Sequence, residues 1–392
     1  MLTISGGQFV FSDKIKTNQA LTVDKGKITS LDENEKADQK ISLDETDMVF
    51  PGFIDLHVHG GGGHDVMEDT EQSLRSISKH LASAGVTGWQ ATTYSAPVVD
   101  MSDVGAAASW LLGSKKSGAE ILGVYHEGPF ISKEKRGAHP ETYIIDPNEK
   151  DLEELIAPAA ASMMTIAPEL PKAIEMIKIL KDRDILASIG HTNAKYEDIQ
   201  KAIEAGATHV THCFNAMSEF NHREPGTVGG VLVSDELTCE IICDLFHVHP
   251  AAISLLVKTK GPQRVAIVTD GILPTGLDDG TYEFAGQNVH VKNGSARLES
   301  GVLAGSISTM NVAVKNLYKS VGLSLPIISI MASTTPARIL ELGTKKGQLA
   351  ENYDADITIL DKDFNAKYTI VGGNIVYQKE PLNKDKESIS NI

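Results

Sequence analysis

The chain has 392 residues, of which 41% are hydrophobic and 22% charged, as is typical of a globular protein with one large domain and a smaller one. The formal net charge of −16 argues against nucleic acid as a partner, because phosphate contacts need a basic surface. An anionic ligand would need a local cluster of positive groups. The sequence shows no apolar run long enough to span a membrane, no signal peptide and only three cysteines, so we expect a cytoplasmic protein without membrane association or disulfides.

The hydrophobic pattern changes at residue 51. Residues 1–50 alternate apolar and polar positions between turn residues, which predicts short β-strands. From residue 53, apolar strands alternate with helical segments, of which the clearest are 69–84, 170–183 and 194–205. Eight strands are predicted, at 53–59, 87–94, 120–126, 163–166, 185–189, 208–212, 239–243 and 265–269.

Repeated strand–helix units predict a parallel sheet, and eight of them favour a closed TIM-like (β/α)8 barrel over residues 51–344. The alternative is an open doubly wound sheet, but the Gly-x-Gly-x-x-Gly pattern that would support it does not follow the first strand. The Asn293-Gly294 pair indicates a β-hairpin inserted at about 281–303, after strand eight. We expect this insertion to be a mobile cover over the barrel mouth.

The two ends of the chain share a strand-rich composition that the middle lacks. Residues 345–380 return to strand character, and the last dozen residues form a polar tail. The segments 1–50 and 345–392 are therefore predicted to form one small β-sandwich domain beside the barrel.

The first barrel strand ends in His57-Val-His59, followed by four glycines. Side chains alternate along a strand, so the two imidazoles point the same way and could form half of a metal site. Other strands end in polar residues too: Glu127, His191, His212, the group Asp244, His247 and His249, and Asp270. Catalytic groups of a barrel lie at these strand ends, so four histidines and two carboxylates are predicted to converge. Such nitrogen and oxygen ligands suit zinc, iron or manganese.

This constellation resembles the amidohydrolase superfamily of metal-dependent barrels. Within it, several motifs resemble the N-acetylglucosamine-6-phosphate deacetylase family, among them Pro51–Gly63, His126–Phe130, Gly137–His139, Gly190–Thr192, Thr211–Met217, His222–Gly226, Thr269–Gly271 and Leu303–Ser306. The resemblance implies one or two divalent metals. We expect Glu127, His191 and His212 to form the tighter site and His57 and His59 to add a second.

The resemblance also implies substrate contacts. His139, beside Ala138, would face the acetamide carbonyl, and His247 would contact the sugar. Asn215 and Ala216 would hold the phosphate. Arg223 would reach that phosphate from the neighbouring subunit of a homodimer, although from the residues alone it could equally be a solvated loop arginine paired with Glu224.

The function implied is hydrolysis of N-acetyl-D-glucosamine 6-phosphate, with Asp270 moving the proton and His139 stabilising the oxyanion. One alternative is a deaminase or cyclic amidase acting on an uncharged base or imide, which would give Arg223 and the Asn215 loop no task. Another is an inactive barrel used for assembly, for which six convergent polar residues would have no use.

Overall fold

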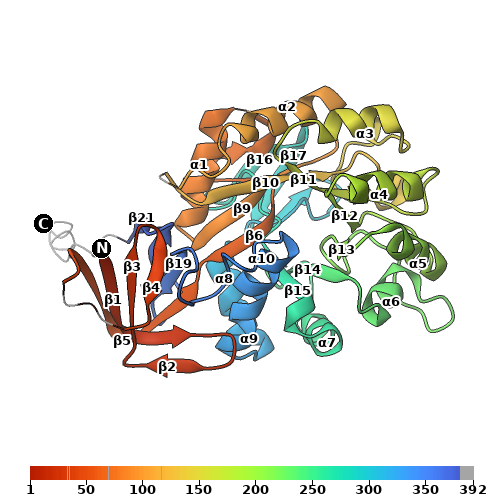
Figure 1. Cartoon of the computed structure of the whole chain (residues 1–392). Coiled ribbons are helices and arrows are strands. Elements are labelled where there is room, and N and C mark those ends of the chain that lie inside the picture. The colour runs from red at the N-terminus through yellow and green to blue at the C-terminus, as the bar shows by residue number, and fades with distance from the viewer. Residues whose placement is uncertain (33, 35, 69, 116, 380–392) are drawn as a thin grey trace, which may run out of the picture.

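The computed structural model describes residues 1–379 except 33, 35, 69 and 116. A parallel β-barrel ringed by helices makes up most of the chain, and a mixed β-sheet lies at one side of it (Figure 1). Both ends of the described chain lie in that sheet. The predicted polar tail falls outside the described residues from 380 onward.

The barrel consists of eight parallel strands in the order of the sequence. They are β6 (Phe53–Val58), β9 (Val86–Thr93), β10 (Glu120–Glu127), β11 (Ala161–Ile166), β12 (Leu186–Ile189), β13 (His209–Val210), β14 (Thr238–Ile242) and β15 (Val265–Val268). The last strand returns to the first, where Val58 pairs in parallel with Gly271. The predicted closed barrel is therefore confirmed, and the open-sheet alternative is wrong.

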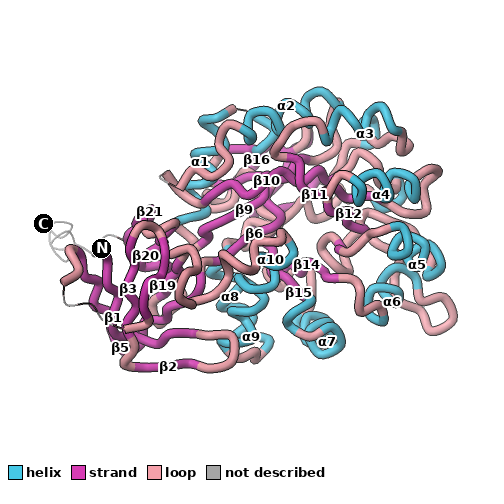
Figure 2. Tube along the Cα trace, in the orientation of Figure 1, coloured by secondary structure: helices cyan, strands magenta, loops and turns pink. Residues whose placement is uncertain are grey.

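Helices cover the outside of the barrel (Figure 2). They are α1 (Glu71–Ala82), α2 (Val98–Ser109), α3 (Glu149–Ile156), α4 (Ala173–Asp182), α5 (Tyr196–Ala205), α6 (Gly226–Val233), α7 (Pro250–Lys260), α8 (Met310–Asn316), α9 (Leu325–Ser329) and α10 (Thr335–Ile339). The Thr70 side chain caps α1 by accepting a hydrogen bond from the Ser73 N–H. The three helices predicted most clearly correspond to α1, α4 and α5.

Strands from both chain ends form one mixed sheet with its own hydrophobic core, which confirms the predicted β-domain. The sheet contains β1 (Leu2–Val10), β2 (Ile15–Thr17), β3 (Ala20–Asp24), β4 (Lys27–Ser30), β5 (Gln39–Pro51), β19 (Ile357–Leu360), β20 (Ala366–Val371) and β21 (Asn374–Gln378). The link between the two ends is made by β5, which pairs with β1 on one edge and β19 on the other. The boundaries at residues 50 and 345 stay predictions.

A buried ion-pair network joins this β-domain to the barrel. The Lys346 ammonium lies 2.6 Å from Glu120, at the start of β10, and 2.6 Å from Asp356, just before β19. Asp354 lies 3.3 Å from the same ammonium and also pairs with Lys27 and Lys115. The two bodies are therefore connected through charge as well as apolar packing.

The segment after β15 forms a three-stranded antiparallel sheet, not the single hairpin that was predicted. Its strands are β16 (Gly280–Phe284), β17 (Gln287–Lys292) and β18 (Ser295–Leu298). The expected turn at Asn293-Gly294 joins β17 to β18, with both residues at positive φ. A second turn at Ala285-Gly286, also at positive φ, supplies the extra strand.

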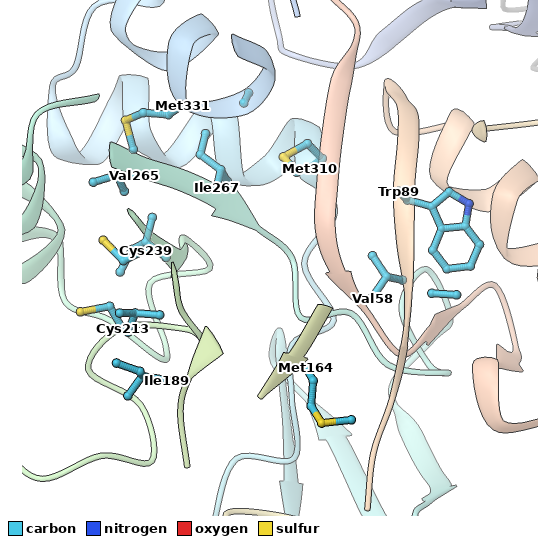
Figure 3. Packing of buried hydrophobic residues seen from close by; sticks show 14 of the residues in the cluster. Val58, Trp89, Met164, Ile189, Cys213, Cys239, Val265, Ile267, Met310 and Met331 are labelled. Atoms are coloured by element: carbon cyan, nitrogen blue, oxygen red, sulfur yellow. The ribbon is translucent and has the colours of Figure 1, made fainter. Parts of the chain in front are cut away.

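The hydrophobic core between the barrel strands and the helices around them consists mainly of aliphatic and sulfur-containing side chains (Figure 3). Cys213 and Cys239 are buried there, and all three cysteines are free thiols. Among the described residues, no helix is long and apolar enough to cross a membrane.

Candidate active site

A cavity of about 310 Å³ opens at the carboxyl ends of the barrel strands. Five of the six predicted strand-end residues line it: His59, Glu127, His191, His212 and Asp270. The sixth, His57, is fully buried, with its Nε2 3.1 Å from Nε2 of His59. The structure therefore brings all six together.

Close backbone packing explains the glycines after His59. A Cβ on Gly60 would lie 2.4 Å from the His64 carbonyl oxygen and 2.8 Å from the Leu273 nitrogen. A side chain there would push apart the loops after strands one and eight, which carry His59 and Asp270.

The carboxylate of Glu127, the last residue of β10, faces histidines on two sides. Its Oε1 lies 3.0 Å from Nε2 of His191 and 2.8 Å from Nε2 of His212. Its Oε2 lies 3.1 Å from Nε2 of His59 and 3.1 Å from Nε2 of His139. One carboxylate can thus contribute to two neighbouring cation sites.

Asp270 completes the group on the His57 side. Its Oδ1 lies 3.3 Å from Nε2 of His59 and 3.5 Å from Nε2 of His57. The ligand atoms of these three buried residues all lie within 4.8 Å of one another.

The hydrogen bonds on the outer edges of the rings show which nitrogens are free for a metal. Nδ1–H of His59 donates to the Thr92 carbonyl at 3.1 Å, and Nδ1–H of His191 donates to the Lys135 carbonyl at 2.7 Å. In each neutral ring, Nε2 then presents a lone pair to the centre.

Facing ring nitrogens need a cation between them. Nε2 of His191 lies 3.1 Å from Nε2 of His212, the same separation as in the His57–His59 pair. Two lone pairs at that distance repel unless a proton or a metal ion lies between them. The donor set and its tautomers therefore fit a divalent metal.

His139 lies against the same carboxylate but has the opposite tautomer. Its Nδ1 accepts a hydrogen bond from the Ser95 backbone N–H at 3.0 Å, so in the neutral ring Nε2 carries the proton. Burial lowers the pKa of His139 to about 4, which keeps the ring neutral near pH 7. A protonated nitrogen cannot bind a metal, so proximity alone would wrongly group His139 with Glu127 and His191 as a ligand.

Burial and neighbouring charges set the protonation of the metal-free site. Burial by itself would raise the pKa of Glu127, but the charges of His57 and His191 hold it well below its ordinary value. Burial would likewise lower the pKa of His59, but bonding to Asp270 and Glu127 raises it to about 9. The carboxylates are thus ionised, and protons on the histidines must leave when a metal binds.

The predicted substrate contacts divide into two groups. Ala138, His139, Asn215, Ala216 and His247 line the cavity. Nδ1–H of His247 donates to Asp244 at 2.6 Å, which orients the ring.

Arg223 is not among the residues that line its own chain's cavity. It is exposed in a loop, and its Nη1 lies 2.9 Å from Nε2 of His222 and not on Glu224. Within one chain, the structure does not bring Arg223 to the other site residues.

The sequence model of the amidohydrolase family matches residues 48–376. The chain belongs to the amidohydrolase family.

Its relatives also fit the narrower resemblance. The chain is 35% identical over 385 residues to the N-acetylglucosamine-6-phosphate deacetylase of Bacillus subtilis (strain 168), covering 96% of this chain and 97% of that one. It is 34% identical over 342 residues to the N-acetylgalactosamine-6-phosphate deacetylase of Escherichia coli O157:H7, covering 86% and 90%. The crystal structure of N-acetylglucosamine-6-phosphate deacetylase from Thermotoga maritima superposes with a TM-score of 0.87 at 35% identity, covering 96% of this chain and all of that one.

Several residues of this amidohydrolase site were not predicted. Lys135 lines the cavity and is its one lysine or arginine among the described residues. Phe284 comes from the inserted sheet and packs edge-on to His59, with ring centroids 5.8 Å apart. Asp55 and Glu240 lie inside the barrel beneath the site, fully buried. The last two could have been noticed as charged residues in the middle of predicted apolar strands.

Proposed function

We propose that this amidohydrolase hydrolyses N-acetyl-D-glucosamine 6-phosphate to D-glucosamine 6-phosphate and acetate. The observation that carries the proposal is one cavity lined by residues that could hold a metal, by a neutral N–H donor at His139 and by the polar side chains of Asn215 and His247. The names of the relatives from Bacillus subtilis and Thermotoga maritima support this substrate.

We further propose that the site holds one or two divalent ions of zinc, iron or manganese. Glu127, His191 and His212 would form the tighter site, and His57 and His59 would add a second, completed by Asp270. A bound ion would polarise the amide carbonyl and lower the pKa of a nearby water.

Asp270 is positioned to move the proton. Burial by itself would raise its pKa, but bonding from His59 and the charge of His57 hold it below its ordinary value, so Asp270 is ionised near pH 7. Its carboxylate accepts a proton as the water oxygen bonds to the carbonyl carbon, and gives that proton to the nitrogen as the C–N bond breaks. The Nε2–H of His139 donates to the carbonyl oxygen as negative charge develops there.

The phosphate end of the substrate needs positive charge in a chain of net charge −16. Lys135 supplies one cation within the same chain. We propose that Arg223 supplies a second from the neighbouring subunit of a homodimer, because its exposed loop leaves it outside its own cavity. An uncharged base or imide, the substrate of the alternative deaminase or cyclic amidase, would leave both cations without a ligand.

Amine release from N-acetylglucosamine 6-phosphate, beside the unphosphorylated sugar and the galacto epimer, tests the proposed substrate. We expect the phosphorylated gluco sugar to give the highest kcat/KM. A preference for an unphosphorylated amide would refute the proposal. A preference for the galacto epimer would instead match the Escherichia coli relative.

Kinetics should separate phosphate recognition from chemistry. Phosphate charge changes little during the reaction, so Arg223→Ala should mainly raise KM. A charge-assisted bond is worth roughly 1.5–3 kcal/mol, which corresponds to a loss of about 10- to 150-fold in kcat/KM for the phosphorylated sugar alone. Asp270→Asn should lower kcat by roughly 10² or more with either sugar.

Mixed dimers of the two variants test the position of the arginine. A site with intact Asp270 lies on the Arg223→Ala chain and would borrow its arginine from the Asp270→Asn chain. Restored activity is expected. No rescue in mixed dimers shown to form would place Arg223 in its own chain's site.

The proposed location is the cytoplasm, in keeping with three free, buried thiols.

A further inference from the structure

Glu240 is a fully buried carboxylate directly beneath the candidate metal centre. It lies in β14, within an otherwise apolar run, Thr238-Cys-Glu-Ile-Ile242. Its oxygens contact three donors: Nδ1 of His57 at 2.9 Å, the backbone N–H of His212 at 3.0 Å and Nε2 of His209 at 3.3 Å. Glu240 therefore touches one residue from each of the two ligand groups.

The contact with His57 fixes its tautomer. A carboxylate can only accept, so Nδ1 of His57 must carry a proton and donate it to Oε2. Nε2 is then the nitrogen available to a metal, and it faces His59 and Asp270. For His59 and His191 the same task falls to backbone carbonyls, whereas His57 depends on an anionic side chain. An anionic acceptor also makes the imidazole a stronger ligand.

The contact with His212 holds a strained backbone. His212 has a φ of +25°, outside the regions that residues with a side chain ordinarily occupy. Its N–H donates to the same Oε2 that accepts from His57. One oxygen atom thus fixes the position of a residue in each ligand group.

Among the residues that the structure describes, histidines alone balance the charge of Glu240. Within the described chain, its ion pairs are with His57 and His209, and none is with a lysine or arginine. Burying a carboxylate without a compensating positive charge is costly, so the charge of Glu240 favours the binding of metal cations to the site above it.

We propose that Glu240 is the positioning residue for the second metal, because it makes His57 a ligand of fixed tautomer and raised basicity. This inference rests on the proposed metal-dependent function and adds to it the residue on which binding of a second ion at His57, His59 and Asp270 depends.

Glu240→Gln is the most direct test. The amide has the same shape and can still accept from His57 and His212 through its oxygen, but it has no charge. Metal-free wild type and variant are titrated with Zn²⁺ by calorimetry and metal analysis. Wild type should bind two equivalents. The variant should bind the first with unchanged affinity and the second about 10- to 100-fold more weakly.

Two further variants separate positioning from folding. Glu120→Gln alters another buried, ion-paired carboxylate on a barrel strand and should leave both binding steps unchanged. His57→Gln should lose the second step, and adding Glu240→Gln to it should weaken zinc binding no further. If Glu240 only supported the fold, the double variant would instead bind zinc more weakly than His57→Gln alone.

Equal affinity for the second ion in wild type and Glu240→Gln would overturn the proposal, as would a wild type that binds only one equivalent. Neither result bears on the proposed substrate, because amine release is measured separately.

Discussion

Replacing His139 with alanine should separate catalysis from metal binding. The structure assigns the proton to Nε2, because Nδ1 accepts from the Ser95 N–H. His139 should therefore donate to the reacting carbonyl oxygen and not bind a metal.

The structure gives the size of the expected loss. Nε2 of His139 lies 3.1 Å from Glu127 Oε2, and the side chain is only 6% exposed, so water is poorly placed to replace the lost donor. Removing one oxyanion donor from a buried site typically costs about 10²- to 10³-fold in kcat, which corresponds to about 2.7–4 kcal/mol. We expect a loss of that order with KM changed much less.

The assay is kcat with saturating N-acetylglucosamine 6-phosphate, alongside the metal content of the same preparation. His139→Ala should retain its metal, whereas the matched control His191→Ala should lose metal and activity together. Because burial lowers the pKa of His139 to about 4, the ring stays neutral from about pH 6 to 8, and the variant should keep the wild-type pH profile there. Loss of metal from His139→Ala comparable to that from His191→Ala would refute the assignment.

The remaining predictions concern the inserted sheet, the release of protons on zinc binding and the ion pairs between the β-domain and the barrel. Hydrogen exchange across residues 280–298 of the inserted sheet should slow when a substrate analogue binds. It should speed up in Gln287→Ala, which removes the 2.8 Å hydrogen bond from this sheet to the Ala138 carbonyl. Unchanged exchange would count against a mobile cover. Zinc binding at about pH 7.5 should release protons, because bonding to carboxylates raises the pKa of His59 to about 9. Calorimetry in two buffers of different ionisation enthalpy measures the number of protons released. A value of zero would contradict this prediction. Lys346→Met should cost about 3 kcal/mol of unfolding free energy near pH 7, because it removes the cation that pairs with the buried carboxylate of Asp356. Burial would raise the pKa of Asp354, but Lys27, Lys115 and Lys346 lower it. The stabilisation by these ion pairs is therefore present above about pH 4 and lost below. If urea unfolding showed the same loss of unfolding free energy in Lys346→Met at every pH, the result would be inconsistent with the network.

The barrel could be predicted because its strands are short apolar runs separated by amphipathic helices. That pattern gave the positions of all eight strands, from β6 (Phe53–Val58) to β15 (Val265–Val268). The residues predicted to converge lie at strand ends, and the carboxyl ends of parallel strands meet at one mouth whatever the loops do. The sequence pattern and the topology were therefore sufficient to predict that these six residues lie together at the barrel mouth.

Residues beneath and above that mouth could not be predicted in the same way. A charged residue in an apolar run can face either the barrel interior or the surrounding helices, and the strand pattern does not say which. Asp55 and Glu240 both face the interior, where Asp55 accepts hydrogen bonds from the N–H and hydroxyl of Thr269. Phe284 reaches the site only because the inserted sheet folds back over it, and loop conformation sets the position of Lys135.

Backbone conformation at the strand ends is the other feature hidden from the sequence. His191, His212 and Asp270 each stand two residues beyond the last residue of a strand, and their φ values are +45°, +25° and +50°. Such conformations cost about 1–3 kcal/mol each for residues with a Cβ and persist only where surrounding contacts impose them.

Those contacts are present at all three residues. The backbone carbonyl of His191 accepts a hydrogen bond from the Ser132 N–H at 2.8 Å. The backbone N–H of Asp270 donates to the His57 carbonyl at 3.0 Å, and its carbonyl accepts from the Ser306 N–H at 2.8 Å. The backbone N–H of His212 donates to Glu240. Each bond ties a residue with a strained backbone to a neighbouring strand or loop, so folding of the barrel by itself places these side chains over the mouth. The conformational entropy of these side chains is then lost during folding and not on metal binding, and this preorganisation should favour tight metal binding.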